Sequence, residues 1–218
     1  MLVAGVINQN KRLYLLFLYL LFSLTGFSQN LWLETEVSGE IMKNLELSIS
    51  PQVRFEEKLN LDEYFFDTGL EYEFSKFLSA GAIYRLGNNI KKKGETESFG
   101  RFALDVKTNY EWKDLETQLR LRYTNANDFG GDNNEKEYYF RVRLKIEYSI
   151  KKLDLIPYGI YELFRNLPDK EFDKSRYEIG LEYKLTKKHR IGSFYRINDS
   201  LVDDDIIKII GLNYKLKL

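Results

Sequence analysis

The sequence contains no cysteine and only one histidine in 218 residues. The lack of cysteine excludes disulfide bonds, thiolate nucleophiles, cysteine-ligated zinc and a lipid anchor on an N-terminal cysteine. A single histidine leaves little basis for serine–histidine catalysis. Formal net charge is also absent, because 33 basic residues balance 33 acidic ones. A general attraction for nucleic acid is therefore not expected. No catalytic, metal or cofactor motif stands out, so we predict no cofactor and no enzyme activity.

Long apolar runs are also scarce, and the one present lies at the N-terminus. Residues 13–24 follow Lys11 and Arg12, and small residues occupy the −3 and −1 positions of a cleavage site after Ser28. This pattern predicts a cleaved signal peptide over residues 1–28 and a single domain over residues 29–218. A transmembrane anchor is the alternative, but the run is shorter than the ~20 residues that a spanning helix needs. With no second helical span, a membrane protein of this sequence has to be a β-barrel.

Aromatic residues and strict alternation are what the sequence has in abundance. Phe, Tyr and Trp make up 15% of the chain. Tyr and Trp are enriched at bilayer interfaces. Apolar and charged residues alternate through segments such as 44–57, 101–112 and 138–148. These segments are as long as the ~9–11 residues with which a tilted strand crosses a bilayer. The sequence therefore predicts an all-β fold, an antiparallel up-and-down transmembrane β-barrel.

The predicted barrel has about 10–12 strands, because single-chain bacterial barrels have even strand numbers. Eleven candidate strands are visible from Leu31 onward. We therefore expect either ten strands, with the first segment outside the wall, or twelve, with one strand unrecognised. Pro51 and Pro157 lie within two of the segments. Proline donates no ladder hydrogen bond, so each is expected at a bulge, a strand end or an unpaired edge.

The connections between the segments alternate in length. Tight turns are predicted at 75–76, 113–114, 151–152 and 186–188, and long polar loops at 88–96, 125–136, 166–174 and 198–205. Short turns at one rim and longer loops at the other are typical of outer-membrane barrels, in which the short turns are periplasmic. This asymmetry predicts export to the bacterial outer membrane. It also implies contact with outer-membrane lipid and lipopolysaccharide, and with the barrel-assembly machinery during insertion.

If the apolar face meets lipid, the charged face lines the lumen. The candidate lumen-lining residues are Arg54, Asp67, Glu71, Glu73, Arg85, Arg101, Asp105, Lys107, Arg120, Arg122, Arg141, Arg143, Glu178, Glu182 and Arg196. One interpretation is a structural barrel whose narrow interior is cross-linked by ion pairs. The other is a narrow pore in which Arg120, Arg122, Arg141 and Arg143 form a basic wall that favours anions, with an acidic patch at Glu71 and Glu73 elsewhere.

Enzyme and metal hypotheses have weaker support. His189 falls in or beside a tight turn at the predicted periplasmic rim, where a solvated role is the simpler interpretation. A hydrolase that uses only carboxylates, at Glu71, Asp105 or Glu178, remains an alternative. Oxygen ligands for a divalent cation occur at 132–135 and 203–205, but solvated loop charge explains them equally well. The lysines at 91–93 suggest contact with lipopolysaccharide, or simply solubility.

A different class of protein shares the same alternation. A soluble periplasmic lipid-binding barrel would turn its Leu, Phe and Tyr side chains inward and its Arg and Glu side chains outward. Periodicity does not distinguish the two arrangements. The aromatic content, the strand lengths and the turn asymmetry favour the membrane barrel.

The sequence resembles a known family at several places. These are the first strand around Trp32, the strand 52–55, the hairpin that begins at 69–72 and continues to Tyr84 and Arg85, and the charged barrel face. Together they resemble the family catalogued as domain of unknown function 2490, regarded as outer-membrane β-barrels of Bacteroidota-type bacteria. The resemblance covers nearly the whole mature chain. It implies a membrane barrel but supplies no activity and no functional residues. Leu218 differs from the terminal aromatic residue common in barrel-assembly signals.

Overall fold

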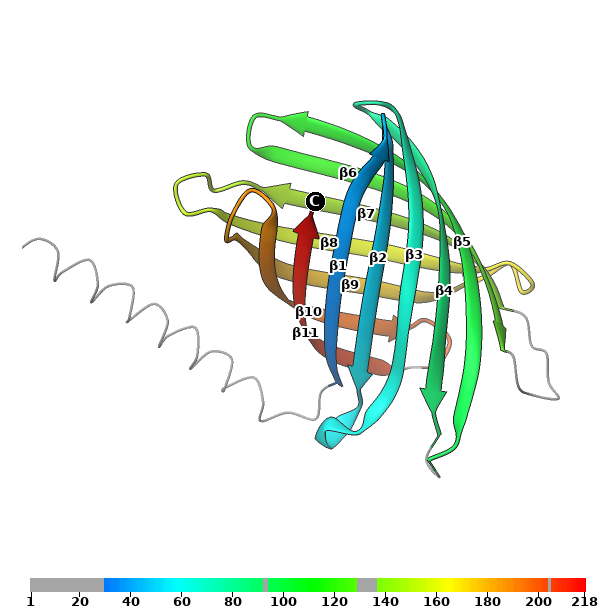
Figure 1. The fold of residues 1–218 in the computed structure, drawn as a ribbon. Helices are drawn as coiled ribbons and strands as arrows, with labels where there is room; N and C mark the ends of the chain where they lie inside the picture. The colour runs from blue at the N-terminus through cyan, green and yellow to red at the C-terminus, as the bar shows by residue number, and fades with distance from the viewer. Residues whose placement is uncertain (1–29, 92–93, 129–136, 204) are drawn as a thin grey trace, which may run out of the picture.

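The computed structural model describes residues 30–91, 94–128, 137–203 and 205–218, and they form one closed β-barrel (Figure 1). The predicted signal peptide lies outside the described residues. The elements are β1 (Asn30–Met42), β2 (Leu45–Phe55), the 3-10 helix η1 (Glu57–Leu59), β3 (Leu61–Ser75), β4 (Leu78–Ile90), β5 (Thr96–Trp112), β6 (Leu115–Asp128), β7 (Glu137–Tyr148), β8 (Leu155–Asn166), β9 (Phe172–Lys184), β10 (His189–Ser200) and β11 (Ile206–Lys217).

The wall consists of eleven strands among the described residues, which lies within the predicted range of 10–12, but the expectation of an even number was wrong. Each strand pairs antiparallel with its neighbours along the chain, and the barrel closes by pairing β1 with β11 in parallel. The reason is geometric. In an up-and-down barrel the first and last of an odd number of strands run in the same direction, so their ladder has to be parallel. All eleven predicted segments are strands, and the up-and-down barrel is confirmed.

Tight connections gather at one rim of the barrel, which we call the turn rim. They lie at 43–44, 76–77, 113–114, 149–154 and 185–188. The described connections at the opposite rim, the loop rim, lie at 56–60 and 167–171, with parts of two more at 91 and 94–95 and at 201–203 and 205. The strands extend further toward the loop rim than predicted, because polar strand ends continue the backbone ladder. β1 begins at the loop rim and β11 ends at the turn rim, so the described chain ends lie at opposite rims.

The two prolines interrupt the ladder in different ways. Pro157 is paired with Leu181 on β9, but the β7–β8 ladder stops at Tyr158, so the missing donor lies at a strand end as expected. Pro51 lies in the middle of β2, at neither a bulge nor a strand end. The β1–β2 ladder is instead open opposite it, between the pairs Glu34↔Gln52 and Val37↔Ile49, and the register is the same on both sides.

The outer face of the barrel is apolar. Large hydrophobic side chains stay exposed around the middle of the wall, among them Leu33, Ile49, Leu104, Val106, Leu119, Leu121, Leu144, Ile146, Ile179, Ile191 and Leu212. Exposed aromatic residues lie toward the turn rim at Tyr72, Phe74, Phe77, Tyr110, Trp112, Tyr148 and Tyr183, and in the loop-rim half at Tyr64, Phe66, Tyr161, Phe172 and Tyr177. The alternative of an inward apolar face is therefore wrong. Among the described residues, none of the helical segments has the length and apolar character of a membrane-crossing helix.

An apolar cluster lies inside the barrel, against the wall where β1 pairs with β11. Trp32, Tyr158, Phe194 and Ile209 are buried together, with Ile160 packed against them. Gly211 lies opposite Phe194, and a Cβ at position 211 would be 1.9 Å from the Phe194 ring. The glycine thus leaves the space that the ring fills. This cluster braces the β1–β11 closure, and Phe65, Phe99 and Phe164 are further buried rings among the polar side chains of the interior.

Candidate functional site in the barrel interior

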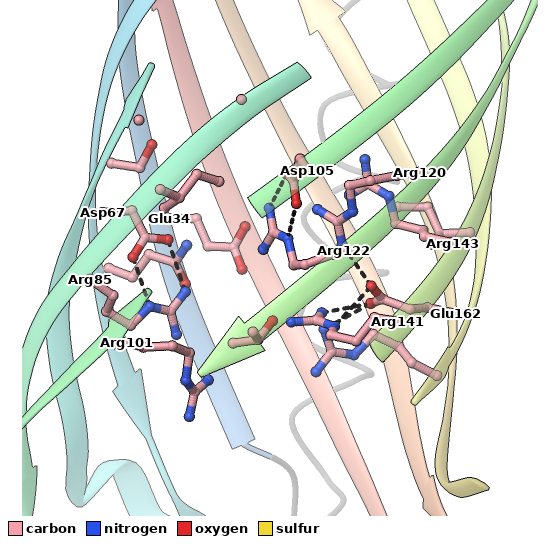
Figure 2. Close-up of a pocket in the computed structure, with 18 of the residues that line it drawn as sticks. Glu34, Asp67, Arg85, Arg101, Asp105, Arg120, Arg122, Arg141, Arg143 and Glu162 are labelled. Atoms are coloured by element: carbon pink, nitrogen blue, oxygen red, sulfur yellow. Dashed lines mark hydrogen bonds and ion pairs between the residues drawn. The ribbon is translucent and has the colours of Figure 1, made fainter. Parts of the chain in front are cut away.

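A polar cavity of about 530 Å³ lies within the barrel, in its middle and toward the loop rim (Figure 2). Residues from β1 to β10 line it. Eleven of them are cationic, namely Arg54, Arg85, Arg101, Lys107, Arg120, Arg122, Arg141, Arg143, Lys174, Arg176 and Arg196. Seven are acidic, namely Glu34, Glu36, Asp67, Glu71, Asp105, Glu162 and Glu178. The lining therefore carries four more positive than negative charges.

Two of the ion pairs in the cavity are bidentate and join neighbouring strands. Arg122 donates from Nε and Nη2 to the two carboxylate oxygens of Asp105, both at 2.6 Å. Arg85 donates in the same way to Asp67, at 2.7 and 2.9 Å. Each pair sits directly opposite in the β-ladder, so strand register alone brings the partners together. Such forked contacts are geometrically specific and stronger than neutral hydrogen bonds.

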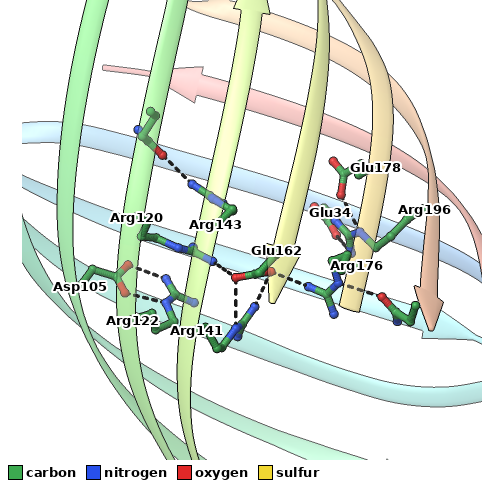
Figure 3. A network of polar contacts seen from close by, with 12 residues as sticks. Glu34, Asp105, Arg120, Arg122, Arg141, Arg143, Glu162, Arg176, Glu178 and Arg196 are labelled. Carbon is green, nitrogen blue, oxygen red and sulfur yellow. Dashed lines mark hydrogen bonds and ion pairs between the residues drawn. The ribbon is translucent and has the colours of Figure 1, made fainter. Parts of the chain in front are cut away.

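Glu162 is the centre of a larger network (Figure 3). Its carboxylate accepts from Arg120 Nη2 at 2.6 Å and from Arg141 Nη2 and Nε at 2.9 and 3.1 Å. Arg176 Nη1 lies 3.5 Å away on the other side. The Glu162 side chain is only 2% exposed. One buried carboxylate thus holds three guanidinium groups, which come from β6, β7 and β9.

A second acidic centre lies nearer the ladder between β1 and β11 that closes the barrel. Arg196 Nε donates to Glu178 at 2.6 Å, and its Nη1 lies 3.6 Å from Glu34. Tyr158 also donates to Glu178, at 3.1 Å. The Arg196 guanidinium stacks over the Trp32 ring, 4.7 Å from the ring centroid. These contacts join the charged lining to the apolar cluster behind it.

The four arginines of the predicted basic wall all line the cavity. Arg120 lies opposite Arg143, and Arg122 lies opposite Arg141, in the β6–β7 ladder. Directly opposed like charges destabilise a sheet unless other groups compensate them. Arg143 faces Glu162 in the β7–β8 register but donates to the neutral Gln118, at 2.6 Å. Among the described residues, no carboxylate lies within ion-pair distance of Arg143.

Further charged side chains occupy the interior between the cavity and the turn rim. Lys215 donates to Glu182 at 2.5 Å, and Lys145 lies 2.9 Å from Glu147. The Glu182 side chain is only 1% exposed. On the opposite wall, Glu71 accepts hydrogen bonds from Lys107 and Ser79. Paired charge therefore continues from the cavity toward the turn rim.

The structure places the sequence-predicted lumen residues as follows. Thirteen of the fifteen line the cavity, and two do not. Glu73 is exposed near the turn rim, and Glu182 is buried below the cavity with Lys215. The prediction missed Glu162, because Pro157 made the faces of β8 hard to assign. Lys174 and Glu34 are also missing from it, although their alternation with Tyr177 and Leu33 is the same signal that identified the others.

Of the residues considered for catalysis, Glu71, Asp105 and Glu178 line the cavity, each in an ion pair with a neighbouring cation. The other candidates for catalysis or metal binding lie elsewhere. His189 Nδ1 is 2.7 Å from the hydroxyl of Tyr214 at the turn rim, and His189 does not line the cavity. Among the described residues, no three His, Cys, Asp or Glu side chains gather in a way that suits a metal ion. Of the candidate cation ligands, 132–135 and Asp204 lie outside the described residues, as do two of the lysines at 91–93.

Solved structures that resemble the chain are β-barrel proteins. One is a loop-deletion mutant of OmpT, an outer membrane protein of Vibrio cholerae, with 12% identity and a TM-score of 0.44; it aligns over 82% of this chain and 60% of that one. Another is an anion-selective porin from Comamonas acidovorans, with 9% identity and a TM-score of 0.39, over 78% and 55%. The chain therefore spans little more than half the length of these structures. No curated protein matches the sequence.

A family profile matches residues 29–201, which is most of the chain and nearly all of the barrel. Its description is "Protein of unknown function (DUF2490)". The match includes the segments on which the resemblance was first noted, from Trp32 through the β3–β4 hairpin. The chain belongs to the DUF2490 family.

Proposed function

We propose that the protein is an outer-membrane barrel whose charged interior forms a narrow pore that prefers anions. The observation that carries this proposal is the combination of an apolar outer face with an inner cavity of net positive lining. An apolar outer face is compatible with the lipid of a bilayer. A charged, polar interior is what dissolved ions need in order to pass.

The outer face supports the membrane placement. Leu, Ile and Val occupy the middle of the wall, and exposed aromatic residues lie in both the turn-rim and the loop-rim halves, as in barrels with an apolar band and aromatic girdles at both interfaces. In water, so large an exposed apolar surface would promote aggregation. The lipid of the outer membrane, and lipopolysaccharide at the loop rim, are therefore the proposed surroundings, and the barrel-assembly machinery is the proposed route of insertion.

The lining supports anion preference. A cavity with four excess positive charges and low-dielectric walls concentrates anions and repels cations. The excess is concentrated on β6, β7 and β9, where Glu162 alone is shared by three arginines. We place the constriction of the pore between the cavity and the turn rim, where the ion pairs of Lys145 and Lys215 occupy the interior.

A purely structural barrel is the second candidate, and the dense ion pairing favours it. Buried forks such as Arg122–Asp105 and Arg85–Asp67 tie neighbouring strands together and fill the interior. Such bracing needs no conduction. The two candidates differ in one measurable property, which is ion flow through a single folded barrel.

Fractionation of the native host, with heat-modifiable migration in detergent gels, tests the membrane placement. We expect the protein in the outer membrane and a mobility shift on boiling. A folded protein found free in the periplasm would overturn the placement. Purified folded barrel is then inserted into planar bilayers under a potassium chloride gradient. We expect small unitary conductance and a reversal potential on the chloride side. No conductance from folded, inserted protein would favour the structural barrel, and a cation-side reversal potential would overturn anion preference.

A further inference from the structure

We propose that the arginines around Glu162 form a binding site for phosphate and small phosphate-bearing solutes. The arginine cluster is defined here as Arg120, Arg141, Arg143 and Arg176. The inference deepens the proposed function, on which it rests, by naming the class of anion that the interior holds rather than merely passes.

The cluster is built into the rigid wall of the barrel. Its members stand on β6, β7 and β9, and their guanidinium groups converge on the cavity from different sides of Glu162 (Figures 2 and 3). Hydrogen bonds to Glu162, Gln118 and Asn198 hold all four of these groups in position. A ligand would therefore meet donors that are already oriented, which reduces the entropy lost on binding.

Charge in the cluster is far from compensated. Four guanidinium groups surround one carboxylate, which leaves an excess of three positive charges. The nearby Asp105 is already engaged by both prongs of Arg122. Glu34 and Glu178 share Arg196, so they leave one negative charge on the far side of the cavity. Buried cations that lack a counter-charge are costly, and a bound anion relieves that cost.

The cluster also has more N–H donors than the protein itself supplies with acceptors. Arg120 Nε and Arg143 Nε are buried, and among the described residues neither has a hydrogen-bond partner. The Arg120 side chain is 7% exposed, so it is more than nine-tenths buried while lining the cavity. Buried donors in native proteins nearly always have partners. These groups suit an acceptor-rich ligand that carries several oxygens.

Phosphate fits this arrangement better than a halide or a single carboxylate. It is an acceptor with oxygens in several directions and a charge between −1 and −2 near neutral pH. Guanidinium forks match it in a bidentate way. Lys174, which lies on the loop-rim side with its Nζ 5.9 Å from the Phe164 centroid, adds a further cation at the approach. A cavity of about 530 Å³ lies within the size range of small-ligand pockets.

Calorimetric titration of the folded, detergent-solubilised barrel with inorganic phosphate tests the proposal. Chloride at equal ionic strength is the reference titration. We expect saturable phosphate binding and none for chloride. Arg143→Gln removes a cation whose only side-chain partner is neutral, so the fold is retained; phosphate binding should weaken by about tenfold, as for one charge-assisted contact. The matched control is Arg165→Gln, on the exposed face of the same wall, which should leave binding unchanged.

Glu162→Gln provides the opposite test. It removes the carboxylate that competes for the arginines, so phosphate should bind at least tenfold more tightly, and thermal unfolding should shift upward with phosphate more than in the parent protein. Folding of this variant is checked by its heat-modifiable migration, and Arg143→Gln carries the test independently. The proposal is overturned if folded parent protein binds no phosphate, or if Arg143→Gln and Arg165→Gln bind it equally.

The phosphate titrations and the conductance measurements test the binding site and the pore separately. Phosphate binding by a barrel that conducts nothing would refute the pore and leave the site. Anion-preferring conductance without phosphate binding would do the reverse.

Discussion

Single glycines decide where large rings fit inside the barrel. Gly211 leaves the space occupied by the Phe194 ring, whereas at Gly159 an added Cβ would find its nearest neighbour, Glu178 O, at 3.9 Å. We expect Gly211→Ala to destabilise the barrel by about 1–3 kcal/mol, because the ring has to leave its position in a packed cluster. The temperature at which the heat-modifiable form is lost measures the effect. Gly159→Ala is the control, and equal behaviour of the two variants would refute the packing argument.

At the residue scale, buried and exposed ion pairs should also differ sharply in how much they contribute to the free energy of folding. Asp105→Asn leaves Arg122 buried without its carboxylate, which should cost about 3 kcal/mol of folding free energy. Lys151 and Asp114 form a comparable contact of 2.7 Å at the turn rim, where Asp114 raises the pKa of the fully exposed Lys151. Lys151→Gln should leave the midpoint of chemical unfolding in detergent unchanged, because solvent screens such pairs. Equal midpoints for both variants would contradict this expectation.

At this scale the sequence revealed which side chains face inward but not which of them meet. Alternation predicted that Asp105 and Arg122 share a face, since each lies between apolar residues. Their pairing depends on the register between β5 and β6, which a period of two does not encode. Glu162 is a stronger example of a contact that alternation does not predict. Its carboxylate is shared by arginines from three other strands, and the register of those strands is known only from the folded barrel.

At the scale of elements, the parallel β1–β11 closure is the least expected feature. It places Leu33 opposite Leu212 and Val37 opposite Leu216. Because the chain has no cysteine, paired cysteines can be introduced without interference. We expect disulfides in Leu33→Cys/Leu212→Cys and in Val37→Cys/Leu216→Cys, since directly paired positions lie within disulfide range. Non-reducing gels and mass spectrometry of the linked peptides provide the readout.

A third cysteine pair makes the direction of the ladder testable. If β1 and β11 were antiparallel with Leu33 opposite Leu212, Val37 would lie opposite Lys208 instead of Leu216. Cross-linking of Val37→Cys/Lys208→Cys in place of Val37→Cys/Leu216→Cys would therefore refute the parallel closure. The eleven segments could be recognised in the sequence, but the expectation of an even number hid that all of them form the wall. The direction of the closing ladder could not be recognised, because alternation is the same in both kinds of ladder.

The whole molecule has two unlike rims, and its proposed orientation puts the turn rim in the periplasm. A protease site inserted within 167–171, at the loop rim, should be cleaved in intact cells. The same insertion at 113–114, at the turn rim, should be cleaved only after the outer membrane is opened. Both positions lie in exposed connections between strands, where insertions are tolerated. Cleavage of the 113–114 insertion alone in intact cells would invert the orientation.

The odd strand number also determines how the two chain ends relate to each other. β1 begins at the loop rim and β11, twelve residues long, ends at the turn rim, a separation of roughly 40 Å along the wall at about 3.3 Å per residue. Circular permutation, which usually needs only a short linker between neighbouring termini, would here need a linker that runs the full height of the barrel. Placed in the wall between β1 and β11, such a linker would itself be a twelfth strand. Joining the ends would thus turn the barrel into an even, wholly antiparallel one.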